Sequence, residues 1–219
     1  MPSPASSPLR SSTPRKPWGT DPRRIPRALL LAAGLVLGCG RSEPLPVLGE
    51  IPPFSLTERS GATVTAHDLA GRVWIADFVF TRCPDVCPAL STHMSALQEP
   101  LASGDDAVRL VSVSVDPSHD DPAVLTTYAG RYRAGPNWLF LTGSRDAVAA
   151  LLRDGFRVAF ADDGPPTSPI THSDRFVLVD RALRIRGYYH GSDQDDLRRL
   201  TADARALRAE ASPHSSAAR

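Results

Sequence analysis

The sequence predicts an α/β fold in which helices flank a sheet that contains parallel strand pairs. Residues 72–80 (RVWIADFVF) form an almost continuous apolar run of strand length, which is typical of a strand covered on both faces. Other strand-like runs alternate along the chain with segments of ten or more residues that have helical periodicity. This alternation favours a layered sheet with parallel pairings. The run at 72–80 is therefore the expected central strand.

The remaining elements follow from the same two periodicities. Residues 54–57 and 63–65, separated by Ser60-Gly61, predict a small hairpin at the start of the body. Residues 84–101 predict a helix, because apolar residues recur there at spacings of three and four. The later predicted elements are a strand at 108–115, a helix at 121–132, a strand at 138–141, a helix at 144–153, two paired strands at 175–179 and 183–188, and a polar helix at 194–209.

Length and charge limit the class of protein. The chain has 219 residues, enough for one domain with a sizeable core. Its 25 basic and 24 acidic residues give a net charge of +1, which excludes a protein that holds nucleic acid mainly by its phosphates. The first 38 residues contain six basic residues and one acidic residue, so the remainder carries more acids than bases. The two parts are expected to have different roles.

Residues 1–38 are predicted to be a signal peptide of the lipoprotein type. The apolar run 28–38 is too short to cross a bilayer but has the length of a secretory leader. It ends Val36-Leu37-Gly38-Cys39, which resembles a lipobox and makes Cys39 the lipidation site; the alternative is an ordinary signal with an unremarkable cysteine. The expected product is an extracytoplasmic lipoprotein on the periplasmic side of a membrane. Residues 39–52 would form a tether, 53–209 the folded domain and 210–219 a disordered tail.

Two cysteines lie where the central strand gives way to the next helix. Cys83 and Cys87 occur in the segment TRCPDVCP at 81–88. Pro84 suits the first helical position, so Cys83 would cap the helix and Cys87 would return to nearly the same face. The sulfurs could then meet, and the helix N-terminus should make both thiols easier to ionise. This pair predicts metal binding or thiol chemistry. A purely structural disulfide, the alternative, would stabilise little because the loop it closes is short.

Asp77 is the only charged residue in the apolar run 73–80. Burying an acid is costly, and an acid placed six residues before Cys83 could accept a proton from a nearby thiol. The alternative is an acid at the end of the strand that reaches solvent. Both interpretations are left open by the sequence, and they differ in whether the carboxylate is buried.

A dithiol that binds Cu(I) or Zn(II) needs at least a third ligand, and imidazole is the usual one beside thiolates. His172 is the best candidate, because it follows the Pro- and Gly-rich loop 161–171 and immediately precedes the strand at 175–179. Its ring could thus be aimed at the end of a neighbouring strand. The other histidines are His119 in a loop after a strand, His67 and His190 at the expected surface, His93 on the wrong helical turn, and His214 in the tail.

Three segments together resemble the Sco/SenC family of copper-binding cytochrome c oxidase assembly proteins. They are residues 73–88, Ser114-Val115-Asp116-Pro117, and His172-Ser173 before the strand at 176–180. Similarity in order and spacing extends from about Phe54 to Leu207, and CPxxCP together with the distal His-Ser is its specific part. The resemblance implies a thioredoxin-like sheet flanked by helices, with an N-terminal hairpin extension.

The resemblance also implies a function. Cys83, Cys87 and His172 would be the copper ligands, and Asp116 matches the acid that the family has near the site. The implied protein is a lipid-anchored copper chaperone that helps to mature the copper centre of a respiratory oxidase. Its partners would be a copper-containing oxidase subunit, other copper chaperones or thiol reductants, and the membrane through its lipid, with no nucleic acid. A metallochaperone is favoured over an enzyme.

The competing hypothesis is an extracytoplasmic thiol-disulfide oxidoreductase that keeps the copper-site cysteines of the oxidase reduced, with Cys83 and Cys87 as catalytic residues. Thioredoxin-like reductases use CxxC and a proline just before the strand that here begins near Arg175. The CxxxC spacing and His172-Ser173 both favour metal binding, and peroxiredoxins lack such a paired motif. In an oxidising compartment the pair would tend to form a disulfide, so a reductant must supply the dithiol before copper binds.

Overall fold

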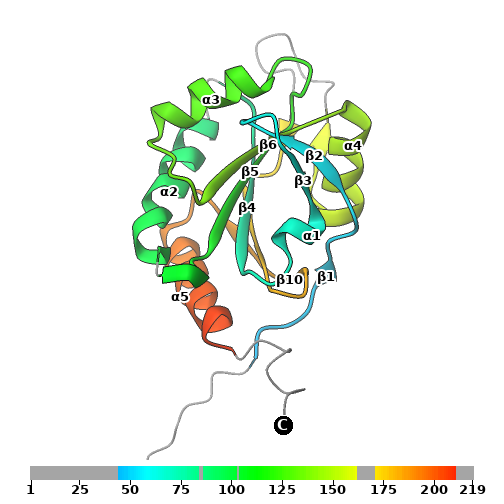
Figure 1. Ribbon diagram of the computed structural model, residues 1–219. Coiled ribbons are helices and arrows are strands. Elements are labelled where there is room, and N and C mark those ends of the chain that lie inside the picture. Colours follow the sequence, from blue (N-terminus) through cyan, green and yellow to red (C-terminus); the bar gives the residue numbers. More distant parts are fainter. Residues whose placement is uncertain (1–43, 84–85, 103, 162–170, 211–219) are drawn as a thin grey trace, which may run out of the picture. The chain divides into compact units, whose positions relative to one another are not determined.

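A sheet of eight strands runs through the part of the chain that this computed structural model describes, residues 44–83, 86–102, 104–161 and 171–210 (Figure 1). The strand order is β1-β10-β9-β4-β5-β6-β2-β3. The strands of this sheet are β1 (Gly49–Glu50), β2 (Ser55–Glu58), β3 (Thr63–Thr65), β4 (Trp74–Val79), β5 (Arg109–Ser114), β6 (Trp138–Thr142), β9 (Arg175–Val179) and β10 (Arg184–His190).

The strand β4 lies in the interior of the sheet, between β9 and β5. All six of its residues are buried, as expected for a strand covered on both faces. It pairs in parallel with β5, where Ala76 faces Val111, and β5 pairs in parallel with β6. Its pairing with β9 is antiparallel, with Ala76 opposite Val177. The predicted central strand and the predicted parallel pairing are therefore confirmed.

The outer strands are antiparallel. The hairpin β2–β3 forms as predicted, with Leu56 opposite Val64, and β2 attaches it to β6. On the other side β9 pairs with β10, as predicted. The edge strand β1 was not predicted. It lies within the segment 39–52 that was expected to be a tether, and its Gly49 faces Ile185 on β10. The end of that segment is thus hydrogen-bonded into the sheet.

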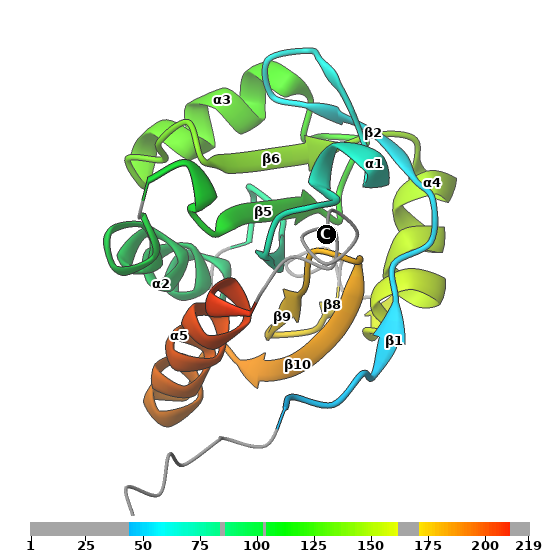
Figure 2. The same cartoon turned by 60° about the horizontal axis from the view of Figure 1, so that its bottom comes forward.

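The helices cover both faces of the sheet. In Figure 2, α2, α3 and α5 gather along one face, and α4 lies on the opposite face. Phe156, in the π-helical turn that follows α4, packs its ring against Trp74 and Phe78 of β4 on that opposite face. The helical segments are α1 (Ala66–Leu69), α2 (Val86–Leu101), the 3-10 turn η1 (Gly104–Asp106), α3 (Pro122–Arg131), α4 (Arg145–Ala150), the π-helical turn η2 (Leu151–Phe156) and α5 (Gln194–Ala209).

Polar side chains fix where three of the helices begin. Asp121 accepts a hydrogen bond of 2.8 Å from the amide of Val124 at the start of α3. Ser144 caps α4, and Asp193 caps α5 by accepting a bond of 2.7 Å from the amide of Asp195. Each cap satisfies an amide that has no partner within its own helix. These local signals explain why the predicted starts at 121, 144 and 194 agree with the structure.

The structure differs from the prediction in two connecting segments. The helix predicted at 144–153 continues past Ala150 as the π-helical turn η2, where the ring centroid of Phe156 lies 5.9 Å from Trp74 and 5.0 Å from Phe78. The loop expected at 161–171 begins and ends in a two-stranded ribbon of β7 (Phe160–Ala161) and β8 (Thr171–His172). The π-turn carries Phe156 onto the sheet, and the ribbon fixes the backbone on both sides of residues 162–170.

The core is built from large side chains on both faces of the sheet. Four of these side chains are fully buried: Trp74, Phe78, Trp138 and Phe140. Burial of each one stabilises the fold by about 2 kcal/mol relative to leaving it exposed. Among the described residues, no helix is long and apolar enough to cross a membrane. The predicted signal peptide, Cys39, the start of the tether and the tail beyond residue 210 lie outside the described residues.

Candidate metal centre

The two cysteines of the predicted site lie beside each other at the end of β4. Cys83 lies in the turn after the strand, where its amide donates a hydrogen bond of 3.1 Å to the carbonyl oxygen of Phe80. Cys87 is the second residue of the described helix α2, and its thiol is near enough to that of Cys83 to be affected by it. Both thiols are free, so no disulfide joins them in the structure. The turn therefore presents an adjacent dithiol, as the spacing predicted.

The thiols differ in burial. Cys83 is half-buried, and Cys87 is completely buried. Burial raises the pKa of the Cys87 thiol well above its ordinary value, and the neighbouring Cys83 and the carboxylate of Asp77 raise it further. The prediction that the helix N-terminus makes both thiols easier to ionise is therefore wrong for Cys87. Loss of hydration outweighs the helix dipole at this depth.

Asp77 is a core residue, with none of its surface exposed. Its Oδ1 accepts a hydrogen bond of 2.5 Å from Ser112, and Ser112 in turn accepts one of 2.9 Å from the indole of Trp138. Its Oδ2 has no hydrogen-bond partner among the described residues. Burial raises the pKa of Asp77 to about 7, although the Ser112 hydrogen bond lowers it. Of the two interpretations, the buried acid is the right one.

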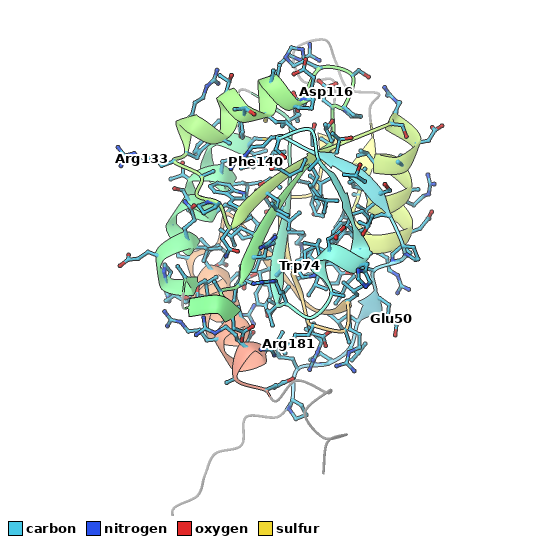
Figure 3. All side chains as sticks on the ribbon, in the orientation of Figure 1. Glu50, Trp74, Asp116, Arg133, Phe140 and Arg181 are labelled. Carbon is cyan, nitrogen blue, oxygen red and sulfur yellow. The ribbon has the colours of Figure 1, made fainter. Side chains whose placement is uncertain are left out.

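Asp116 lies at the end of β5, next to the cysteine turn. Its carboxylate is 2.5 Å from the guanidinium of Arg82, the residue before Cys83. Asp116 is 6% exposed, whereas the Arg82 side chain is 54% exposed, so the pair lies at the rim of the core. This ion pair ties the cysteine turn to the loop after β5. Figure 3 shows Asp116 at one end of the sheet and Arg181 at the opposite end.

Sequence reasoning missed Asp120, which is hydrogen-bonded to the start of the same turn. This fully buried carboxylate accepts hydrogen bonds from the amide of Thr81 at 3.1 Å, from the hydroxyl of Thr81 at 2.6 Å and from Ser114 at 2.6 Å. One of its partners lies 39 positions away along the chain, so neither spacing nor periodicity signals the interaction. The turn that carries Cys83 is thus fixed to β5 and its loop by two acids.

His172 reaches the same end of the sheet through its backbone. β4 and β9 are antiparallel neighbours, so the end of β4, which leads to Cys83, and the start of β9, which follows His172, lie at one edge. In β8, His172 pairs with Phe160, and the amide of Ser173 donates a hydrogen bond of 3.2 Å to Ala159. The placement of the His172 side chain lies outside what the structure describes. Among the side chains that it does describe, no three His, Cys, Asp or Glu residues gather as a ligand set.

None of the remaining described histidines joins the dithiol in a ligand set. His93 on α2 is bonded through Nδ1 to the carbonyl oxygen of Gly191 at 2.6 Å. His190 is exposed at the end of β10, 3.1 Å from the carboxylate of Asp174. His67 and His119 are also exposed. His119 lies in the loop that follows Asp116, on the same end of the sheet as the dithiol.

Comparisons with known proteins agree with this architecture. A model of the SCO1/SenC family matches residues 47–207. The SCO1 protein homolog of Bacillus subtilis is 33% identical over 168 residues, which are 74% of this chain and 86% of that protein. The solved structure of BsSco, described as a member of the Sco family of cytochrome c oxidase assembly proteins with a disulfide switch, is 30% identical with a TM-score of 0.68. That match covers 77% of this chain and 100% of the BsSco chain.

A third comparison involves a metal-bound relative. The structure of ScoI from Bradyrhizobium japonicum with copper bound is 26% identical, has a TM-score of 0.62, and matches 71% of this chain and 98% of its own. These neighbours confirm the thioredoxin-like fold that the sequence implied. The family match runs from before β1 into the last turn of α5 and includes the dithiol, Asp116 and His172. The chain therefore belongs to the SCO1/SenC family.

Proposed function

We propose that this protein binds copper through Cys83, Cys87 and His172 and helps to mature the copper centre of a respiratory cytochrome oxidase. The observation that carries the proposal is that two free, adjacent thiols and the backbone of His172 lie at the same end of the sheet. The relatives support it, since ScoI was solved with copper bound and BsSco is described as a member of an oxidase assembly family.

The donor set suits copper as the cargo. Two thiolates and an imidazole are soft and borderline ligands, which favour Cu(I) and other thiophilic ions over magnesium or calcium. The ligand thiols must lose their protons when metal binds. Burial holds the proton on Cys87, and the carboxylate of Asp77 lies close enough to raise the pKa of that thiol. Asp77 has an unpaired Oδ2 and a pKa of about 7, so it is suited to receive this proton.

The experiment is a copper competition titration on the reduced full-length chain. Cys83→Ser, Cys87→Ser and His172→Ala should each lower the affinity for Cu(I) by at least about tenfold, because removal of one ligand leaves an incomplete shell. His93→Ala is the matched control, since the ring of His93 is bonded to the carbonyl oxygen of Gly191 and His93 lies six residues beyond Cys87 on α2. Equal affinity of the wild type and His172→Ala would contradict the three-ligand set.

We further propose that residues 1–38 are removed on export and that Cys39 carries the lipid, which would anchor the domain on the periplasmic side of a membrane. The support is the short apolar run before Gly38-Cys39. Cys39→Ser should release the protein from the membrane fraction and abolish incorporation of labelled fatty acid. A Cys39→Ser protein that stays membrane-bound would contradict the lipid anchor.

The second candidate function is reduction of the cysteines of an oxidase copper site. It is favoured by one observation: Cys83 is half-buried, which leaves part of it accessible, and the buried Cys87 lies next to it, the arrangement needed for attack and resolution in disulfide exchange.

A further inference from the structure

A cavity of about 310 Å³ lies next to the cysteine turn. Thr81 and Arg82 of the turn form one side of it, and His119 from the loop after β5 forms another. The third side is one face of α3, where Thr127, Tyr128 and Arg131 recur at helical spacing. This volume corresponds to about ten water molecules, which is enough for the end of a side chain or a small ligand.

The lining of this cavity is cationic. The described residues that line it include Arg82, Arg131 and His119, and none of these described residues is an Asp or Glu. The charge of Arg82 is already matched by Asp116 at 2.5 Å. Arg131 is exposed, and neither its guanidinium nor the His119 ring has a hydrogen bond or ion pair with any residue that the structure describes. Two polar side chains therefore face the cavity without a partner in the described part of the chain.

Tyr128 connects the cavity to α2, the helix that carries Cys87. The Tyr128 hydroxyl shares a hydrogen bond of 2.8 Å with Ser91 on α2, one helical turn beyond Cys87. Tyr128 and Cys87 are near enough to affect each other electrostatically. On the other side of the cavity, Arg82 immediately precedes the half-buried Cys83. A group held in the cavity would thus lie beside Arg82, the residue that precedes the more accessible thiol.

We infer that this cavity binds a carboxylate group of the molecule that reacts at Cys83. One unpaired guanidinium beside one imidazole matches a single negative charge, and the neighbouring Thr81 and Thr127 line the same space. The inference rests on the proposed function only in that Cys83 is the group that meets the partner. The carboxylate can come from an acidic side chain of a partner protein or from a small thiol that carries carboxylates.

Disulfide exchange with small reagents measures this preference without copper. The Cys83 thiolate attacks one sulfur of the reagent, the S–S bond of the reagent breaks, and one thiolate leaves with the bonding electrons. The Cys87 thiol then loses its proton, attacks the mixed disulfide and releases the second thiolate. The protein dithiol is oxidised, and the reagent is reduced to two thiolates.

The probes are 5,5′-dithiobis(2-nitrobenzoate), which carries two carboxylates, and the uncharged 4,4′-dithiodipyridine. They are used on the full-length chain with Cys39→Ser, so that only the pair reacts. Arg131→Gln should lower the rate ratio of the anionic to the neutral reagent by about fivefold, the effect of losing one exposed charge pair. Arg133→Gln is the matched control, because Arg133 is equally cationic and exposed but does not line the cavity.

An unchanged ratio in Arg131→Gln would overturn the inference. An equal decrease in Arg131→Gln and Arg133→Gln would also overturn it, because that result indicates general attraction of anions and not a site. If the protein did not bind copper but the rate ratio of the two reagents still depended on Arg131, the proposed function would be contradicted and the carboxylate site would stand. The two failures are thus distinguishable.

Two further arms identify the source of the carboxylate, and both begin with the oxidised pair. The first compares reduction by glutathione and by its monoethyl ester, which has one carboxylate fewer. The second compares two cysteine peptides, one with Glu and one with Gln next to the cysteine. If only glutathione is preferred over its ester, and this preference depends on Arg131, the carboxylate belongs to a small thiol. If the Glu peptide is preferred over the Gln peptide in the same way, the carboxylate belongs to an acidic segment of a partner protein. No preference in either arm would overturn the inference for thiol partners.

Discussion

Ser112 on β5 donates a hydrogen bond of 2.5 Å to the carboxylate of Asp77, directly across the parallel strand pair. The bond fixes one oxygen of an acid that has no exposed surface, and the other oxygen has no partner among the described residues. Ionising Asp77 in the folded state is therefore costly. As a result, the contribution of Asp77 to the stability of the fold depends on pH.

Asp77→Asn should stabilise the fold at alkaline pH. The pKa of Asp77 is raised from 3.8 to about 7 in the folded state, so the folded state binds this proton more tightly than the unfolded state. The contribution of Asp77 to stability is thus fully present below pH 4 and is lost as pH rises toward 7. Urea unfolding should show a gain for Asp77→Asn that grows from near zero at pH 4 to about 2–4 kcal/mol at pH 8. A gain that does not change with pH would contradict the raised pKa; Asp154→Asn, on an exposed acid, is the control.

The two thiols should react at different rates with an alkylating reagent. Iodoacetamide should modify Cys83 at least about tenfold faster than Cys87 in the reduced folded protein, because Cys87 is buried and its pKa is raised. Peptide mapping by mass spectrometry measures the two rates separately. Both sites should react at similar rates in urea. Preferential labelling of Cys87 in the folded state would show that Cys87 is not the buried thiol.

Asp120→Ala should destabilise the protein by about 2–4 kcal/mol, because three donors on Thr81 and Ser114 lose their buried acceptor. Chemical denaturation with an unchanged m-value provides the measurement. Asp154→Ala, whose side chain is 61% exposed, should change stability by less than about 0.5 kcal/mol. If both variants had equally small effects, Asp120 would not be fixing the turn.

Insulin reduction separates the two candidate functions. A copper chaperone should reduce insulin slowly beside a thioredoxin control, and one equivalent of Cu(I) should suppress the remaining activity, because the metal occupies the same thiolates. The physical reason is that the spacing of Cys83 and Cys87 suits two ligands of one metal ion. Turnover comparable to thioredoxin and unaffected by copper would favour the oxidoreductase.

Elements that are determined by their own local residues were predictable from the sequence. The strand at β4 is a single apolar run, and α5 begins after a capping aspartate, so local residues determine both. The π-helical turn was not predictable, because it depends on how Phe156 packs against Trp74 and Phe78, which are more than 70 residues away. The strands of the β7–β8 ribbon have two residues each, too few to show a period.

The same distinction holds at the candidate metal centre. The dithiol could be predicted because both cysteines lie within one turn and a helix start. Asp120 and the carboxylate cavity could not, because their residues come together only when β4, the loop after β5 and α3 pack against one another. The raised pKa of Cys87 was also missed, since burial of its sulfur is a property of the whole core and not of the helix N-terminus.

Arg186 on β10 binds the chain where it enters the domain, by donating to the carbonyl oxygens of Leu45 and Pro46 while it pairs with Asp180 at 2.9 Å. Asp180 follows Val179, which faces Trp74 at the start of β4, so this clamp lies at the opposite end of β4 from Cys83. A pulling force on residues before Leu45 would therefore be borne by Arg186 and the β1–β10 hydrogen bonds. The strands in between would isolate the dithiol mechanically from such a force.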